Sequence, residues 1–185
     1  MAGSGTAVDT HLLRKLPASG RHCFFTARGN TVNYWLMKSE PSVFSIDDLA
    51  RRPGRTDSWD GVRNYQARNM LRDEMQPGDC AFFYHSSCEE PGVAGVMKIV
   101  SRGQPDTAAF ARRSDYYDSG STPAAPRWYS VDVQLQRKFK RVITLTELRA
   151  QRALAGLALL QRGNRLSVLP VSSAEWKCIL SLAAD

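Results

Sequence analysis

The stretch Tyr129-Ser130-Val131-Asp132-Val133-Gln134-Leu135-Gln136 alternates apolar and polar residues along its whole length. Successive side chains of a β-strand point to opposite faces of a sheet. The alternation therefore predicts a strand with one buried face and one face in water. It is the clearest strand signal in the chain, and the other predicted elements lie on either side of it in the sequence.

Shorter strands are predicted on the N-terminal side of this stretch. Tyr34-Trp35-Leu36-Met37 predicts a buried strand that ends at Pro41, because proline lacks the amide donor of a sheet ladder. The segments 80–85 and 92–100 are rich in residues that favour strands. Residues 102–126 are rich in Gly, Ser, Pro and Asp, and we expect a long surface excursion there.

Helix starts are predicted where a serine or threonine precedes an acidic residue by three positions. The two side chains can then cap the free backbone groups of the first turn. One pair begins a short helix through Leu49, and a longer helix is expected over roughly 62–75, after the turn Trp59-Asp60-Gly61. The capping pairs are Ser45 with Asp48, Thr144 with Glu147, and Ser172 with Glu175.

This order of elements favours an α+β fold. The chain lacks the regular alternation of strands and helices that is typical of a doubly wound sheet. Several non-adjacent strands are instead expected to curl into a small barrel with short helices around it.

The composition fits one soluble globular domain. The chain has 185 residues, of which 43% are hydrophobic, and its mean hydropathy is −0.36. No apolar run approaches the ~20 residues that cross a membrane, and no secretory signal is seen. We therefore expect a cytoplasmic protein without a membrane partner. The net charge of +7 permits a polyanionic partner but does not demand one.

Residues 1–32 differ in composition from the rest of the chain. They contain mostly Gly, Ser, Thr and Ala, with four basic residues and one acidic residue. We expect a disordered N-terminal extension or an over-called start over 1–32, followed by a single domain over 33–183.

Signals for catalysis or metal binding are weak. The sequence has no Gly-rich phosphate loop and no Gly-x-Ser-x-Gly motif. Cys88 follows His85 by three residues, but no third group that would orient the pair is evident. The four cysteines form no Cys-x-x-Cys pair, so we expect neither a metal nor a cofactor.

Six aromatic residues near predicted strand ends and turns have two interpretations. Taken singly, each is most simply a core residue. Together they can form a cage in which a flat base stacks with a gain of about 1–3 kcal/mol per contact, while polar neighbours read its edge. The aromatic residues are Trp35, Trp59, Tyr65, Tyr84, Trp128 and Tyr129, and the polar neighbours are Ser39, Asn64, His85 and Ser86. Ser39 and Asn64 also have a simpler role as caps of a turn and a helix.

A basic run follows the clearest strand. It is either a solvated strand end or a set of phosphate contacts that position a nucleic acid without reading its sequence. The candidate phosphate contacts are Arg137, Lys138, Lys140 and Arg141.

Several long and unusual blocks follow one another between Asn33 and about Leu182 without large gaps. They are Tyr34-Trp35-Leu36-Met37-Lys38-Ser39-Glu40-Pro41, Phe44-Ser45-Ile46-Asp47-Asp48-Leu49, Trp59-Asp60-Gly61-Val62-Arg63-Asn64-Tyr65-Gln66-Ala67-Arg68-Asn69, Phe82-Phe83-Tyr84-His85-Ser86 with Pro91-Gly92-Val93-Ala94-Gly95, Tyr116-Tyr117-Asp118, Pro126-Arg127-Trp128 with Val131-Asp132-Val133, and Pro170-Val171-Ser172 with Glu175-Trp176. Together they resemble the EVE-domain family of the PUA-like superfamily, in the stand-alone form typical of bacteria.

The resemblance implies a PUA-like distorted β-barrel of about five or six strands flanked by short helices. It also implies a binding protein, not an enzyme, that recognises a modified nucleobase in DNA or RNA, such as 5-methylcytosine, through an aromatic pocket and without a cofactor or metal. The pocket residues carried over by position are Lys38, Ser39, Trp59, Asn64, Tyr65, Tyr84, His85, Ser86 and Trp128.

Three hypotheses about function are therefore compatible with the sequence. In the leading one, Trp59, Tyr65 and Trp128 cage a base whose edge is read by His85 and Ser39. The second is a nucleotide- or RNA-modifying enzyme that uses His85 as a base. The third is a protein-interaction module or RNA-associated adaptor whose pocket is vestigial.

Overall fold

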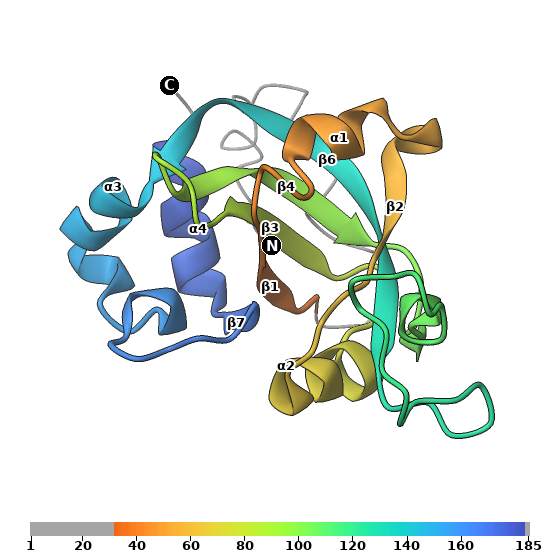
Figure 1. Ribbon diagram of the computed structural model, residues 1–185. Helices are drawn as coiled ribbons and strands as arrows, with labels where there is room; N and C mark the ends of the chain where they lie inside the picture. The colour runs from red at the N-terminus through yellow and green to blue at the C-terminus, as the bar shows by residue number, and fades with distance from the viewer. Residues whose placement is uncertain (1–31, 184–185) are drawn as a thin grey trace, which may run out of the picture.

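A β-sheet of mixed strand direction forms the framework of the computed structural model, which describes residues 32–183. The expectation for residues 1–32 therefore lies outside the described residues, except for Val32. The sheet of the described chain has seven strands in the order β2-β6-β4-β3-β1-β7, and β5 pairs with β6 (Figure 1). The strands are β1 (Tyr34–Ser39), β2 (Thr56–Trp59), β3 (Cys80–His85), β4 (Gly92–Ile99), β5 (Gln104–Pro105), β6 (Tyr129–Thr144) and β7 (Val168–Val171).

The α+β class is confirmed, but the sheet is not closed into a barrel. Within residues 32–183, the end strands β2 and β7 each pair with one neighbour only. The sheet of the described chain has more strands than the five or six expected, and β2, the two-residue β5 and β7 were not among the predicted strands. β1 and β3 are parallel, and all other pairs are antiparallel.

β6 contains the alternating stretch and continues eight residues beyond it, to Thr144. The regular pattern ends at Gln136 because the pairing with β4 shifts register twice, between Val93 and Gly95 and between Val96 and Met97. At Gly95 the two backbones are so close that a Cβ atom would lie 2.3 Å from the carbonyl oxygen of Arg137. These irregularities allow one long strand to bend around the sheet.

Short helices surround the sheet, and all three predicted capping boxes are present. The predicted helix over 62–75 begins later, at Tyr65, where the side chain of Asn64 accepts hydrogen bonds from the amides of Gln66 and Ala67. The regular helices are α1 (Ile46–Arg51), α2 (Tyr65–Asn69), α3 (Leu145–Ala150) and α4 (Ser173–Leu182), and the shorter or irregular turns are η2 (Pro53–Arg55), η3 (Met70–Glu74), η4 (Thr107–Ala109), η5 (Arg152–Leu154) and η6 (Ala158–Leu160). Within residues 32–183, no helix is long and apolar enough to cross a membrane.

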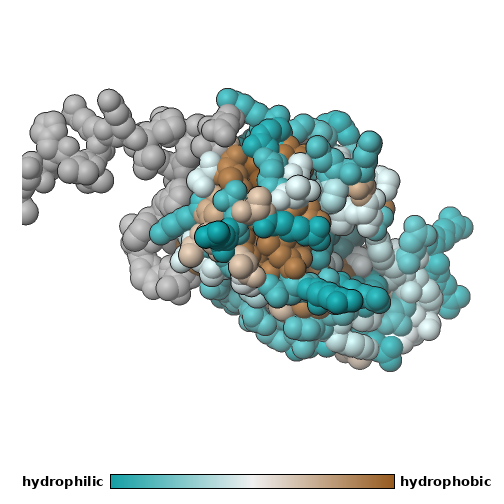
Figure 2. All heavy atoms as spheres, turned by 90° about the vertical axis from the view of Figure 1, so that its left-hand side faces the viewer, coloured by the Kyte–Doolittle hydropathy of each residue, from teal (hydrophilic) through white to brown (hydrophobic). Residues whose placement is uncertain are grey.

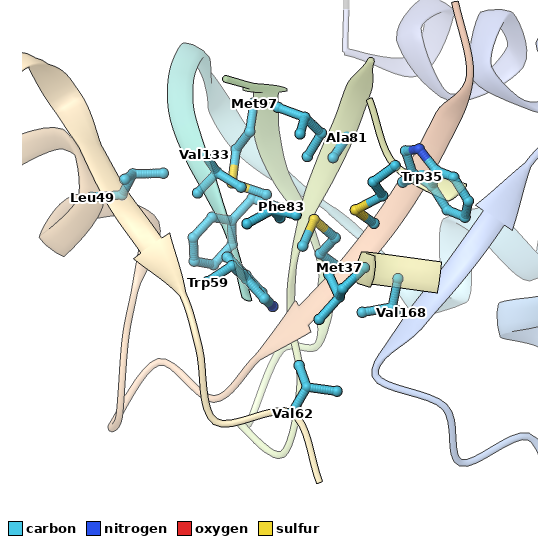
Figure 3. Close-up of a cluster of buried hydrophobic side chains, with 14 of the residues drawn as sticks. Trp35, Met37, Leu49, Trp59, Val62, Ala81, Phe83, Met97, Val133 and Val168 are labelled. Carbon is cyan, nitrogen blue, oxygen red and sulfur yellow. The ribbon is translucent and has the colours of Figure 1, made fainter. Parts of the chain in front are cut away.

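Two hydrophobic clusters pack against the two faces of the sheet. Because strand residues alternate between faces, Phe83 belongs to the first cluster, and its neighbours Phe82 and Tyr84 belong to the second. The first cluster includes Trp59 at the end of β2 (Figure 3). The second packs around Trp176 of α4, and apolar residues are visible on the side of the molecule that carries α3 (Figure 2).

Candidate functional site

A cavity of about 750 Å³ opens where the carboxyl ends of β1 and β3 meet the end of β2. These ends meet because β1 and β3 are parallel neighbours, with Ser39 of β1 opposite His85 of β3. Lys38 and Ser39 line the cavity from β1, and Ser86 lines it from the loop after β3. Trp59 lines it from β2. Its size is within the range of small-ligand sites and is sufficient for one nucleotide.

Trp59 forms part of the cavity wall and is also a core residue. Its side chain is 6% exposed and packs edge-on against Phe83, at a centroid distance of 5.2 Å, and against Phe44, at 6.4 Å. Phe44 also lines the cavity. The indole N–H of Trp59 makes no hydrogen bond to any residue in 32–183. The wall therefore offers an aromatic edge and a free donor.

Asp60, the residue after Trp59, provides a hydrogen-bond acceptor in the cavity lining. Its carboxylate lines the cavity and accepts no hydrogen bond from any other described residue. Partial desolvation, together with the negative charges of Asp106 and Asp57, raises the pKa of Asp60 above its ordinary value. A carboxylate in this environment gains more than usual from a ligand that donates a hydrogen bond.

A buried carboxylate fixes the turn that carries Asp60. Asp106 is fully buried and accepts hydrogen bonds from the amide of Gly61 (3.1 Å) and from the guanidinium of Arg63 (2.7 Å). Arg63 also donates to the carbonyl oxygen of Tyr116. Gly61 has a φ of 71°, and a Cβ atom there would lie 2.7 Å from the ring of Tyr116, so the turn requires glycine.

Polar contacts hold the opposite wall of the cavity together, and His85 accepts one of these hydrogen bonds. The Ser39 hydroxyl donates to the carbonyl oxygen of Phe44 (2.7 Å), and the amide of Ser86 donates to the carbonyl oxygen of Ser39 (2.9 Å). The amide of Ile46 donates to Nε2 of His85 (3.2 Å). Burial lowers the pKa of His85, which keeps the imidazole neutral near pH 7. His85 thus anchors the start of α1 and does not line the cavity.

Two cations on one side of the cavity have no acidic partner within residues 32–183. Lys38 is half-buried, and this burial lowers the pKa of its ammonium group. Arg165 precedes β7 and is exposed. On the other side, Arg52 forms an ion pair with Asp57 at 2.6 Å. Lys38 and Arg165 are therefore the cavity cations available to an anionic ligand.

The remaining predicted pocket residues lie elsewhere. Tyr84 is 3% exposed within the second hydrophobic cluster, and burial raises the pKa of its phenol to about 12. Asn64 caps α2. Tyr65 and Trp128 stack on each other at 4.9 Å, outside the lining of the cavity. The structure thus brings together Lys38, Ser39, Trp59 and Ser86 but leaves the other predicted aromatic residues outside the cavity lining.

The predicted phosphate contacts on β6 also lie outside the cavity lining. Lys138 forms an ion pair with Asp47, and Arg141 forms one with Glu147. The guanidinium of Arg137 lies over the ring of Phe139, and Lys140 is exposed. Two of these four cations are therefore partly neutralised by acidic neighbours.

No group of three His, Cys, Asp or Glu side chains among the described residues could hold a metal ion. In the same part of the chain Cys88 and Cys178 form no disulfide bond. The described residues therefore contain no set of metal ligands in addition to the aromatic and charged groups of the cavity.

Sequence comparison identifies the domain that carries this cavity. The EVE domain pattern matches residues 33–182. The chain belongs to the EVE-domain family. The match covers all seven strands and all four regular helices of the described chain, so the cavity lies entirely within the EVE domain.

Relatives of this EVE domain are known in animals and bacteria. Human thymocyte nuclear protein 1 is 46% identical over 170 residues, which cover 83% of this chain and 75% of that protein. A Pseudomonas syringae protein of solved structure is 51% identical, with a TM-score of 0.78 and coverage of 81% of this chain and 99% of that chain. The crystal structure of human THYN1 in complex with 5-methylcytosine-containing DNA is 45% identical, with a TM-score of 0.77 and coverage of 83% and 98%. These likenesses confirm the PUA-like α+β fold.

Sequence reasoning missed several residues of the EVE-domain cavity, namely Phe44, Asp60, Arg63, Tyr116 and Arg165. Asp60 and Arg63 lie within the block that contains Trp59, so an acidic residue beside a candidate stacking residue was the available signal. Tyr116 and Arg165 are remote in sequence, and no local pattern places them near Trp59.

Proposed function

We propose that this EVE domain binds nucleic acid by taking one modified cytosine into the cavity beside Trp59, and that it does so without catalysis. The observation that carries the proposal is the position of Asp60 next to an aromatic wall, as an acceptor to which no other residue in 32–183 donates a hydrogen bond. The complex of the human relative with 5-methylcytosine-containing DNA supports the same ligand class.

The chemistry of cytosine matches these groups. Its exocyclic amine is a hydrogen-bond donor, and a carboxylate is the side chain suited to accept from it. The free indole N–H of Trp59 and the ammonium of Lys38 supply donors for the ring nitrogen and the carbonyl oxygen of the base. Val43, which is 63% exposed at the rim, and Phe44 offer apolar surface to a 5-methyl group.

The position of the cavity requires the base to leave its stack. A base within a duplex cannot reach a pocket beside the sheet, so it must be flipped out or come from a single strand. Lys38 and Arg165 then contact the phosphates that flank it. DNA, as in the complex of the human relative, is the polymer we propose to test first. A cytoplasmic location and the stand-alone bacterial type stay predictions.

The geometry does not favour an enzyme that uses His85 as a general base. Nε2 of His85 already accepts the amide hydrogen of Ile46, and the ring lies outside the cavity lining. A base must be within hydrogen-bond reach of the proton that it removes. The adaptor hypothesis predicts that the cavity takes no base, so that binding is insensitive to substitutions in the cavity. The following titration distinguishes it from a reader of modified bases.

Asp60→Ala is expected to weaken binding to a duplex with a single 5-methylcytosine by about tenfold, because the contact to the exocyclic amine is lost. Fluorescence anisotropy at one fixed salt concentration measures this change. Simple electrostatics predicts the opposite sign, since the substitution removes a negative charge near the phosphates.

Asp57→Asn provides the matched comparison. It removes an equal charge from the same cavity and frees Arg52, so we expect it to strengthen binding modestly. If both variants bind more tightly than the unchanged chain, Asp60 does not read the base. If the unchanged chain binds no DNA, or binds it with an affinity that neither variant changes, the adaptor hypothesis gains.

A further inference from the structure

A second aromatic group lies beside the cavity without lining it. The ring of Tyr65 stacks on that of Trp128, with centroids 4.9 Å apart and planes inclined by 27°. The guanidinium of Arg68 lies 4.9 Å from the centroid of Tyr65, and that of Arg63 lies 5.3 Å from the centroid of Trp128. We call these four side chains the stacked column.

Hydrogen bonds hold the stacked column rigid. The indole N–H of Trp128 donates to Asp118 (2.7 Å), and Arg68 donates to the carbonyl oxygen of Arg127 (2.6 Å). Arg63 is fixed by Asp106 and Tyr116 and also lines the cavity. One end of the column is therefore shared with the cavity wall.

The other end of the stacked column faces solvent. Trp128 is 7% exposed, whereas Tyr65 is 56% exposed, the largest value among the exposed aromatic residues of the described chain. Cations dominate its surroundings, because Arg68 has no acidic partner within residues 32–183 and the Arg127 side chain is half-exposed. Two carboxylates contact the column: Asp106 forms an ion pair with Arg63, and Asp118 accepts from Trp128 while its charge is opposed by Arg127 at 3.6 Å.

We propose that Tyr65 is a stacking platform for the nucleotide next to the base in the cavity, with Arg68 and Arg127 on its phosphates. The inference rests on the proposed function, because the flanking nucleotide is defined by the base that the cavity holds. An exposed, rigid ring between guanidinium groups matches a nucleotide, which combines a flat base with an anionic phosphate. A stacked flanking base contributes affinity without reading the modification, because every base has a π-face.

The test compares two oligonucleotide duplexes that are identical except for a methyl group on one cytosine. Tyr65→Ala is expected to raise the dissociation constants for both duplexes by the same factor, about tenfold, and to keep the preference for the methylated one. Tyr65→Phe should restore most of the lost affinity, since stacking needs the ring and not the hydroxyl. Tyr117→Ala is the matched control, because Tyr117 is 40% exposed and makes no ring contact with the column.

The outcomes separate the two proposals. An unchanged affinity of Tyr65→Ala for both duplexes would overturn the platform, and so would a loss confined to the methylated duplex, which would place Tyr65 in the pocket. An equal loss in Tyr65→Ala and Tyr117→Ala would also overturn it. If the unchanged chain shows no methyl preference, the proposed function fails, while the effect of Tyr65→Ala on general binding still decides whether the ring contacts nucleic acid.

Discussion

Trp59→Ala is expected to lower the free energy of unfolding by about 3–5 kcal/mol, the usual cost of deleting a large buried aromatic side chain. Trp59 is 6% exposed, and its ring contacts Phe44 and Phe83 within the first hydrophobic cluster. The deletion leaves a void beside the packed rings of Phe44 and Phe83, which these rings cannot fill completely. Urea denaturation measures the change, with an unchanged m-value if unfolding stays two-state.

Tyr65→Ala is the contrasting variant for this measurement. Tyr65 is 56% exposed, so its replacement should cost less than about 1 kcal/mol. Equal losses of stability in the two variants would contradict the placement of Trp59 in the core and of Tyr65 on the surface. Because Trp59→Ala changes folding as well as the cavity wall, its binding does not isolate the contribution of the ring. Asp60→Ala, at an exposed position, tests the cavity without a large loss of stability.

Asp106→Ala is expected to lower the free energy of unfolding by about 3 kcal/mol. The carboxylate is fully buried, and its removal leaves the Gly61 and Ala108 amides without their acceptor and the Arg63 guanidinium without its ionic partner. Arg63 remains 24% exposed, so water partly solvates the orphaned charge and keeps the loss at the lower end for buried pairs. The turn that carries Asp60 should also loosen, and base binding should weaken with it.

Asp73→Ala is the control for this loss. Asp73 pairs with Arg72 on the surface, and exposed pairs contribute below about 1 kcal/mol. Chemical denaturation of both variants under the same buffer conditions gives the comparison. If Asp106→Ala costs no more than Asp73→Ala, Asp106 does not fix the turn.

Much of the fold was predictable because its signals are local. Alternation in β6 and the capping box at Ser45 depend on neighbours within a few residues, and both are confirmed. β2 was missed because the strand has only four residues, Thr56–Trp59, and most of them are polar. The bend in β6 depends on its partner strand β4, which a pattern within one strand cannot show.

The site was less predictable because long-range contacts decide it. Trp59 and Tyr65 are six residues apart and were expected to share one cage, yet β2 directs one ring into the core and α2 leaves the other exposed. Which of them contacts a ligand stays a prediction. The support from Asp106 and Tyr116 comes from residues more than forty positions away from the turn.

The preference of the unchanged chain for a methylated cytosine tests the central claim most directly. The measurement is a titration with two duplexes that differ by one 5-methyl group, repeated at increasing salt. We expect the methylated duplex to bind about fourfold more tightly, the value for one buried carbon at ~0.8 kcal/mol. This ratio should persist while both affinities fall with salt, because methyl burial releases no counterions. Equal dissociation constants at every salt concentration would contradict the claim and leave only non-specific attraction to phosphate.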